Sequence, residues 1–469
     1  MLQSVASADE GLYALVAREL LRGHLPYTTV WETKPPLLFA LLAGAFALFG
    51  TSMAALRIAT DLAIFATSLA LYAIGTSLPR DGRTVGLAAA LLYAALTLSD
   101  SASSALAETF YAPFVAIPIA MALYRRRHRR VAGPLVASAL GACLGCAVLV
   151  KESAVLEAVF AAIIIVRTLG ARAGGPLLLG FVAAIAASVL PYAAEHELAA
   201  YWDANVSAVA RRAFVAVTDA TPLADVLRAQ ALAFFPTTLL AFGLPWFFRR
   251  DVSEDDERSF ARFALAWVAV DLSTVTAIRE YLGNHFIPLM APAALLGALV
   301  AVALARRLGN RAFVPAVLAV GLLAHCAYQF VLAAPVAYAR FARHDPTFGD
   351  PTAQLAAYIV SHAAPGTTLY VADDRTILYV LTGLAPPTRF AYSAHLVDRY
   401  QETIAGVSGA REIVRAFARH PLFVVRDLAN REREDPPSRD VLDRALARAY
   451  RVAFARGART IYVYDGGKS

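Results

Sequence analysis

The stretch that decides the fold runs from residue 7 to residue 50 and reads SADEGLYALVARELLRGHLPYTTVWETKPPLLFALLAGAFALFG. It opens with two adjacent carboxylates, Asp9 and Glu10, and it carries Glu32 and Lys34 just before two prolines and an apolar run. A charged segment broken by proline is costly at a membrane unless it lines an aqueous cavity or a site. We therefore predict that the rest of the chain is a scaffold that holds this segment at a bilayer surface.

The composition is that of a membrane protein. Of the 469 residues, 58% are hydrophobic and 17% are charged, whereas soluble proteins carry about 25% charged residues. The apolar residues form runs of about twenty, which is the length that crosses a hydrocarbon core of roughly 30 Å. The sequence therefore predicts an α-helical polytopic membrane protein.

Arginines set the predicted orientation of the spans. The apolar runs lie near residues 55–77, 84–99, 106–124, 133–150, 154–168, 176–193, 231–248, 260–278, 286–305 and 312–334. Arginines gather in every second connection, which places those connections in the cytoplasm. The net charge of +7 follows from this bias and does not indicate nucleic-acid binding. The first loop and the C-terminal tail are then extracytoplasmic.

Two further helices are predicted near the N-terminus. Residues 11–23 have the spacing of an amphipathic helix, and residues 36–50 are apolar but too short to span, which is typical of an interfacial helix.

The composition changes near residue 340, where the apolar runs shorten to strand length. Strands are predicted at 367–373, 421–427, 451–457 and 459–465, and helices at 374–382, 409–419 and 437–449. We divide the chain into a transmembrane catalytic domain, residues 1–339 with the first external loop over 1–50, and a small soluble extracytoplasmic α/β domain, residues 340–469.

The cysteines do not predict a metal or redox site. Cys143, Cys146 and Cys326 all lie in apolar runs, where a cysteine packs as a small hydrophobic residue. No histidine and cysteine cluster has metal-ligand spacing. A divalent metal is therefore not indicated, although nothing excludes one, and no other cofactor is predicted.

The first loop offers a proton acceptor and a cation. Asp9 or Glu10 could act as general base toward an acceptor hydroxyl, or both could be ordinary acidic residues at a helix N-terminus. The prolines after Lys34 suppress helix and could aim its ammonium at a phosphate, with Glu32 in support. The alternative is a lysine that snorkels beside an apolar helix.

A second set of charged residues lies at span ends on the same predicted face. Glu108 is costly about one turn inside a span unless it is paired or functional, and the alternative is a helix-start glutamate at the water line. Lys151 closes an apolar span, and the alternative to a functional role is an ion pair with Glu152 or another nearby group. Arg279, Tyr281 and His285 follow in REYLGNHFIPLMAP, where arginine and histidine together could hold a phosphate or could simply face lipid headgroups.

These motifs resemble a known family. The first loop, together with ALAETFYAPF (105–114), AVLVKESAVL (147–156) and REYLGNHFIPLMAP (279–292), is similar to GT-C glycosyltransferases. The resemblance is to the bacterial family 39 and aminoarabinose-transferase-like group, which is related to protein O-mannosyltransferases. Two departures stand out: relatives carry a span before the loop, and many have aspartate where this chain has Glu32.

The resemblance implies an inverting, inner-membrane glycosyltransferase that moves a sugar from a polyprenyl-phosphate carrier to an extracytoplasmic glycan, lipid or protein hydroxyl. It assigns Asp9 as catalytic base, Glu108 as second acidic site and Lys34 as the contact of the carrier phosphate. Lys151, Arg279 and His285 become further phosphate or headgroup contacts. The competing hypotheses are a transporter or flippase of lipid-linked sugars and a non-catalytic protein that binds the carrier.

Overall fold

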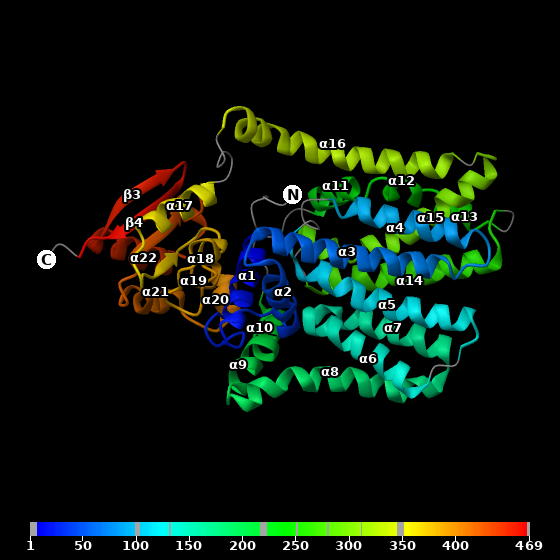
Figure 1. The fold of residues 1–469 in the computed structure, drawn as a ribbon, viewed down its shortest axis with the longest axis horizontal. Helices are drawn as coiled ribbons and strands as arrows, with labels where there is room; N and C mark the ends of the chain where they lie inside the picture. Colours follow the sequence, from blue (N-terminus) through cyan, green and yellow to red (C-terminus); the bar gives the residue numbers. More distant parts are fainter. Residues whose placement is uncertain are drawn as a thin grey trace. The chain divides into compact units, whose positions relative to one another are not determined.

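The computed structural model describes residues 7–98, 104–130, 133–215, 223–249, 252–278, 281–310, 312–344 and 351–466. The chain forms two compact units (Figure 1). The first, which we call the mixed unit, comprises Met1–Leu56, Val189–Thr218 and Ala334–Ser469. The second, the helical unit, comprises Arg57–Ser188 and Asp219–Ala333. The predicted division into two domains at residue 340 stays a prediction.

The helical unit is built from long apolar helices that lie side by side (Figure 1). They are α3 (Met53–Gly75), α4 (Gly82–Leu96), α5 (Ala107–Arg127), α6 (Pro134–Val150), α7 (Val155–Leu169), α8 (Gly174–Ala194), α14 (Asp255–Ile278), α15 (Met290–Arg307) and α16 (Phe313–Ala342). The first turn of α3 and the last turns of α8 and α16 belong to the mixed unit. Shorter pieces are η1 (Glu152–Ala154), η2 (Ala171–Ala173), α11 (Leu223–Ala233), α12 (Thr237–Ala241), α13 (Leu244–Phe247) and η4 (Gly283–Phe286).

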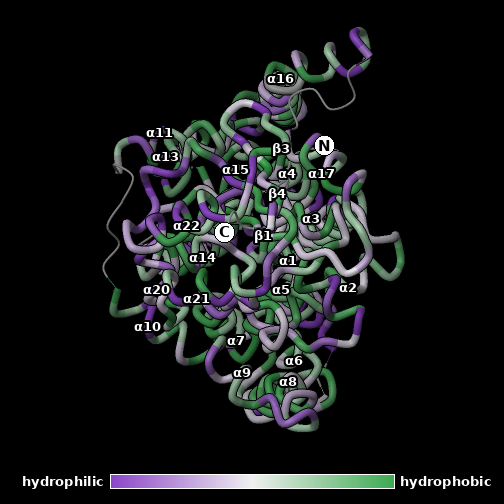
Figure 2. The backbone as a smooth tube through the Cα atoms, turned by 90° about the vertical axis from the view of Figure 1, so that its left-hand side faces the viewer, coloured by the Kyte–Doolittle hydropathy of each residue, from purple (hydrophilic) through white to green (hydrophobic). Residues whose placement is uncertain are grey.

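Length and composition identify the membrane-spanning helices. Among the residues that the structure describes, six helices are long and apolar enough to cross a membrane: Met53–Gly75, Ala107–Arg127, Ala171–Ala194, Asp255–Ala277, Met290–Arg307 and Phe313–Val331. The hydropathy colouring marks α8 as one of the apolar helices (Figure 2). The predicted polytopic helical membrane protein is confirmed.

One predicted span is wrong. The run at 231–248 is not a single helix but is divided among α11, α12 and α13. Pro236 and Pro245 lack the N–H that an uninterrupted helix needs. Apolar composition alone did not reveal these interruptions.

Glycines allow α3 and α4 to pack backbone against backbone. A Cβ on Gly86 would lie 2.4 Å from the carbonyl oxygen of Tyr72, and one on Gly75 would lie 2.4 Å from the Cα of Gly86. No larger residue fits either position without moving a helix. The α3–α4 hairpin is therefore a rigid part of the helical unit.

The mixed unit contains the sheet. Its strands are β1 (Leu369–Val371), β2 (Phe423–Asp427), β3 (Tyr450–Arg456) and β4 (Arg459–Tyr464), in the order β1-β2-β4-β3. β1 pairs parallel with β2, and the other two pairings are antiparallel. β1, β2 and β4 lie within the predicted strand segments, and β3 begins one residue before its predicted segment.

Helices from three parts of the sequence complete the mixed unit. They are α1 (Ala8–Leu21), α2 (Pro36–Phe49), α9 (Leu198–Trp202), η3 (Asp203–Ser207), α10 (Ala208–Phe214), α17 (Pro351–His362), α18 (Ile377–Thr382), α19 (Ala394–Val397), α20 (Arg399–Ala405), α21 (Gly409–Phe417), η5 (Arg431–Arg433) and α22 (Pro436–Ala449).

Helix α1 is buried rather than amphipathic at a water boundary. Every residue from Glu10 to Glu19 is buried, because α1 packs against both α2 and α18. Gly11 makes the second contact possible, since a Cβ there would lie 2.6 Å from the backbone nitrogen of Ile377. Arg18 clamps the same contact by donating to the carbonyls of Tyr379 and Leu384.

The first loop also contributes to the hydrophobic core of the mixed unit. Trp31 packs in one cluster with Tyr370, Phe390 and Val424, and its backbone N–H donates to the carbonyl of Arg389 at 2.8 Å. The N-terminal stretch and the α/β segment are therefore parts of one folded body.

Candidate functional site

The loop between α1 and α2 is shaped by Tyr27. This fully buried tyrosine has a positive φ of 74°, stacks on Tyr192 at 5.8 Å between ring centroids and meets Phe39 edge-on. Its hydroxyl donates to the backbone carbonyl of Lys34 at 2.7 Å. Burial raises the pKa of Tyr27 well above its ordinary value, which keeps the donor proton in place. A non-glycine residue in the left-handed region persists only where its surroundings fix it. Tyr27 thus holds the backbone of Lys34.

Two cations flank Thr33 inside this loop. The Nζ of Lys34 lies 3.9 Å from Glu32 Oε1, and both side chains are largely buried. Thr33 donates its hydroxyl to the same Glu32 oxygen at 3.3 Å and accepts from Arg212 Nη2 at 3.2 Å. Together, Lys34, Arg212 and Glu32 carry one net positive charge. Such a group favours an anion with several acceptor oxygens, as phosphate has.

A neutral histidine lies beside these cations. His395, from α19, is buried and meets Trp31 edge-on at 4.7 Å between ring centroids. Burial, followed by the charges of Arg212 and Lys34, lowers the pKa of His395 to about 3. Its Nδ1 has no hydrogen-bond partner among the residues that the structure describes. Buried polar atoms are normally paired, so this nitrogen is available to a ligand.

The helix that carries Arg212 is anchored by its neighbour. Asp203, in η3, accepts from Trp31 Nε1 at 3.1 Å and from Arg211 Nη2 at 3.0 Å. Arg211 also donates to the carbonyl of Ile404 at 2.7 Å. These bonds fix α10 against the first loop, so that the arginine next in sequence reaches Thr33.

The two adjacent carboxylates differ in access. Ser7 caps α1 by accepting the N–H of Glu10 at 3.1 Å, and Glu10 itself is fully buried, whereas Asp9 is half-buried. Asp9 is therefore the carboxylate that a substrate can reach. The rings of Tyr13 and Phe39, whose centroids are 6.1 Å apart, pack the second turn of α1 against the first turn of α2 and so fix the helix that carries Asp9.

A cavity of about 520 Å³ opens beside Ala8, the residue before Asp9. Its other walls include Asp373 and Asp374, which follow β1, and Asp427, which ends β2. These strands are parallel, and ligands of α/β sheets bind outside the carboxyl ends of such strands. The volume lies in the range of small-molecule sites.

Two carboxylates that line this cavity, Asp373 and Glu434, belong to a buried ion network. Arg426 donates to Asp373 at 3.3 Å, to Glu434 at 2.7 Å and to Asp443. Burial, followed by the hydrogen bond with Glu434, raises the pKa of Asp373 to about 9. One proton is therefore held between these two carboxylates at neutral pH. The cavity offers carboxylate acceptors and arginine donors, the groups that bind sugar hydroxyls.

The helical unit brings together a second set of predicted residues. Glu108, in the first turn of α5, accepts from Lys151 Nζ at 2.5 Å and from Asn284 Nδ2 at 2.9 Å. His285 is near enough to act on the charge of Glu108. Lys151 lies at the break between α6 and η1, and there its side chain turns back to α5. The structure thus supports the ion-pair alternative for Lys151, with Glu108 as its partner, and Glu108 is buried rather than at a water boundary.

Two further buried carboxylates extend this set. Tyr111 donates its hydroxyl to Glu157, and Asp271 is close enough to interact electrostatically with Glu157. Neither carboxylate oxygen of Asp271 has a hydrogen-bond partner within the described parts of the chain. Buried carboxylates inside apolar helices are costly and mark functional positions.

Some predicted residues stay untested. Arg279 lies outside the described residues. Tyr281 is half-buried just before η4, and its role stays a prediction. The prediction that Asp9, Glu10, Glu32 and Lys34 share one site with Glu108, Lys151 and His285 also stays a prediction.

The sequence analysis missed several residues. Asp271 and Glu157 carried a usable signal, because each is an acidic residue inside a predicted span. Arg212, His395 and Asn284 carried none, since only folding brings them to Thr33, Trp31 and Glu108. Within the described ranges, no group of three or more histidine, cysteine, aspartate or glutamate residues could hold a metal ion.

Comparison with solved structures identifies the fold. The crystal structure of ArnT from Cupriavidus metallidurans bound to undecaprenyl phosphate matches with a TM-score of 0.62 and 15% identity, over 99% of this chain and 94% of that one. ArnT in the apo state matches with the same TM-score and coverage at 17% identity. The chain has the GT-C fold.

The remaining comparisons are one weaker structural match and two sequence searches. The oligosaccharyltransferase AglB from Archaeoglobus fulgidus, in complex with an inhibitory peptide and a dolichol-phosphate, matches with a TM-score of 0.48 at 13% identity, over 91% of this chain and 66% of that one. No protein-family model matches the chain. No curated protein matches it in sequence.

Proposed function

We propose that this protein is an integral-membrane glycosyltransferase that moves a sugar from a polyprenyl-phosphate carrier to an acceptor hydroxyl at the extracytoplasmic face. The observation that carries the proposal is the half-buried pair of cations, Lys34 and Arg212, on either side of Thr33. ArnT, which has the same fold, has a crystal structure with undecaprenyl phosphate bound. The carrier phosphate is the anion that we assign to this pair.

The cations stabilise the leaving group. As the bond between the anomeric carbon and the phosphate oxygen breaks, the phosphate keeps the electron pair and gains negative charge. Lys34 and Arg212 are already in place to stabilise that charge, and donors aimed at developing charge account for a large part of catalysis. The neutral imidazole of His395 adds one hydrogen bond to the phosphate. The Nδ1 atom donates to a phosphate oxygen when it carries the proton, and it accepts from a phosphate hydroxyl when it does not.

Asp9 is the proposed general base. It takes the proton of the acceptor hydroxyl while that oxygen attacks the anomeric carbon, in one displacement that inverts the configuration. Glu10 is too buried to compete for this role. The acceptor occupies the cavity beside Ala8, where it is within the same unit as the base.

The experiment is a transfer assay with the purified full-length protein in lipid. Radiolabelled polyprenyl-phosphate sugars are supplied with lipid, glycan and peptide acceptors, and labelled product is measured. A transferase forms product and releases polyprenyl phosphate in equal amounts. A flippase or a non-catalytic carrier-binding protein leaves the donor intact, and this outcome across the donor and acceptor panel would refute the proposal.

A further inference from the structure

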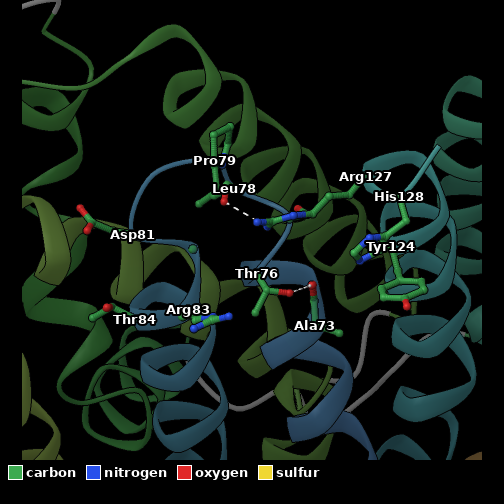
Figure 3. A pocket seen from close by; sticks show the side chains of 12 residues that line it. Ala73, Thr76, Leu78, Pro79, Asp81, Arg83, Thr84, Tyr124, Arg127 and His128 are labelled. Atoms are coloured by element: carbon green, nitrogen blue, oxygen red, sulfur yellow. Dashed lines mark hydrogen bonds between the residues drawn. The ribbon is translucent and has the colours of Figure 1, made fainter.

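The helical unit has a cavity of its own, at the other end of α5 from Glu108. Its volume is about 520 Å³, and it lies where the ends of α3, α4 and α5 meet (Figure 3). Glu108 and Arg127 are nineteen residues apart on α5, which corresponds to about 28 Å along the helix. This cavity is therefore separate from the cluster around Glu108.

The polar side chains that line the cavity are mostly cationic or hydroxyl-bearing. They include Thr76, Arg83, Thr84, Arg127 and His128, together with one carboxylate, that of Asp81. In Figure 3, Arg127 extends from α5 toward the α3–α4 connection, where it donates to the carbonyl of Leu78 at 3.4 Å, and Arg83 lies beside Thr76. Among the described residues, neither arginine is part of an ion pair. Two guanidinium groups and several hydroxyls together suit a phosphate.

The backbone adds to the positive potential. Gly82, Arg83 and Thr84 are the first three residues of α4, and all three line the cavity. Their N–H groups precede the first bond within the helix, and the N-cap Asp81 makes no side-chain hydrogen bond to them. The carboxylate of Asp81 instead pairs with Arg306 at 3.3 Å. An N-terminal turn of this kind favours anions.

Apolar stripes lead from this cavity along two spanning helices. On α3 the exposed residues Leu62, Phe65, Leu69 and Tyr72 follow helical spacing, and Thr76 lies one turn beyond them. On α5 the exposed residues are Ile117, Met121 and Tyr124, and Tyr124 itself lines the cavity. A free phosphate ion makes no contact with these apolar residues, whereas the acyl chains of a phospholipid would pack against them.

We propose that this cavity binds the phosphate group of an anionic phospholipid, whose acyl chains lie on the exposed stripes of α3 and α5. The rigid α3–α4 hairpin, held by Gly75 and Gly86, keeps the N-terminal turn of α4 aimed at the headgroup. The site is independent of the proposed transfer reaction and holds even where no transfer is found.

The test uses the full-length protein in detergent, with lipid binding followed by native mass spectrometry and by thermal unfolding. Phosphatidylglycerol, phosphatidylcholine and inorganic phosphate are the three probes. The double variant Arg83→Gln/Arg127→Gln should bind phosphatidylglycerol at least tenfold more weakly than the wild type, and Thr84→Glu should do the same. The matched control is Arg167→Gln/Arg172→Gln, which removes two exposed arginines that do not line the cavity.

The outcomes separate the sources of the phosphate. Retention of phosphatidylglycerol by the wild type and the control, with its loss in both cavity variants, supports the proposal. Equal binding of phosphatidylcholine, equal protection by inorganic phosphate alone, or undiminished binding in the cavity variants would each overturn it. Because Arg83 and Arg127 are exposed, both variants should fold, and monodisperse elution checks this.

Discussion

Replacing Gly11 by alanine should separate α1 from α18. The added Cβ would lie 2.6 Å from the backbone nitrogen of Ile377, and ordinary contact begins at 3.4 Å, so one helix must move by at least 0.8 Å. Overpacking of this kind costs about 1–3 kcal/mol. Alanine returns about 0.5–1 kcal/mol through its higher helix propensity. From the middle of both ranges, we expect a net loss of about 1 kcal/mol in the free energy of unfolding of the mixed unit.

The displacement should also reduce transfer. Asp9 lies two residues before Gly11 in the same helix, so a shift of α1 moves the proposed base relative to the cavity beside Ala8. A misplacement of about 1 Å can reduce the rate by a factor of about 100. Transfer by the variant should therefore fall more than its stability alone explains.

Gly44 provides the matched control within the mixed unit. It lies in α2, is exposed, and a Cβ there would meet nothing within 4 Å. Gly44→Ala should therefore raise the melting temperature slightly, whereas Gly11→Ala should lower it by roughly 2–4 °C per kcal/mol lost. The assay is thermal unfolding in detergent with a near-ultraviolet signal. Equal melting temperatures for the two variants would refute the tight packing of α1 against α18.

Two further predictions concern charge. Lys151→Met leaves the charge of Glu108 buried without its cation and should lower the free energy of unfolding by about 3–5 kcal/mol. The double variant Lys151→Met/Glu108→Gln should recover most of this loss, because the unpaired charge is then removed. A double variant as unstable as the single one would contradict the pairing. Below pH 6.5 the unfolded imidazole of His395 takes up a proton that the folded one does not accept above about pH 3, so its contribution to the free energy of unfolding falls by about 1.4 kcal/mol per pH unit as the pH drops. Asp373 acts in the opposite direction, because its unfolded carboxyl loses its proton above about pH 3.8 whereas the folded one keeps it up to about pH 9, so its contribution falls as the pH rises across that window. The difference in the free energy of unfolding between His395→Gln and the wild type should therefore change by about 1.4 kcal/mol per pH unit between pH 3 and 6.5, and the difference for Asp373→Asn should change by as much per unit between pH 3.8 and 9. Differences that do not vary with pH would exclude these assignments.

Much of the fold could be predicted from the sequence because hydrophobic periodicity reports burial directly. The strands near 369–371 and 423–427 carry apolar runs that fit no helix, and the spans carry runs that fit no strand. The break at Pro236 was missed because apolar residues continue on both sides of the proline. Helix α1 was taken as amphipathic because sequence spacing cannot show that α18, more than 350 residues later, covers its polar side.

The sequence could predict only those site residues that are charged and lie at the ends of apolar runs. Glu108 and Lys151 were visible because each is a charge at the end of an apolar run, and the structure pairs them. Arg212 is one of many arginines in the sequence, and nothing local distinguishes it from Arg211, which anchors α10. Only the folded chain shows which arginine reaches Thr33.

The central claim is that Lys34 holds the carrier phosphate while Asp9 performs the chemistry, and one paired measurement tests it most directly. Binding of polyprenyl phosphate and single-turnover sugar transfer are measured for Asp9→Asn and Lys34→Gln in the full-length protein. The account predicts that Asp9→Asn binds the carrier as the wild type does but loses at least 100-fold in transfer, whereas Lys34→Gln loses at least tenfold in carrier binding. Wild-type transfer by Asp9→Asn, or wild-type carrier binding by Lys34→Gln, would contradict it.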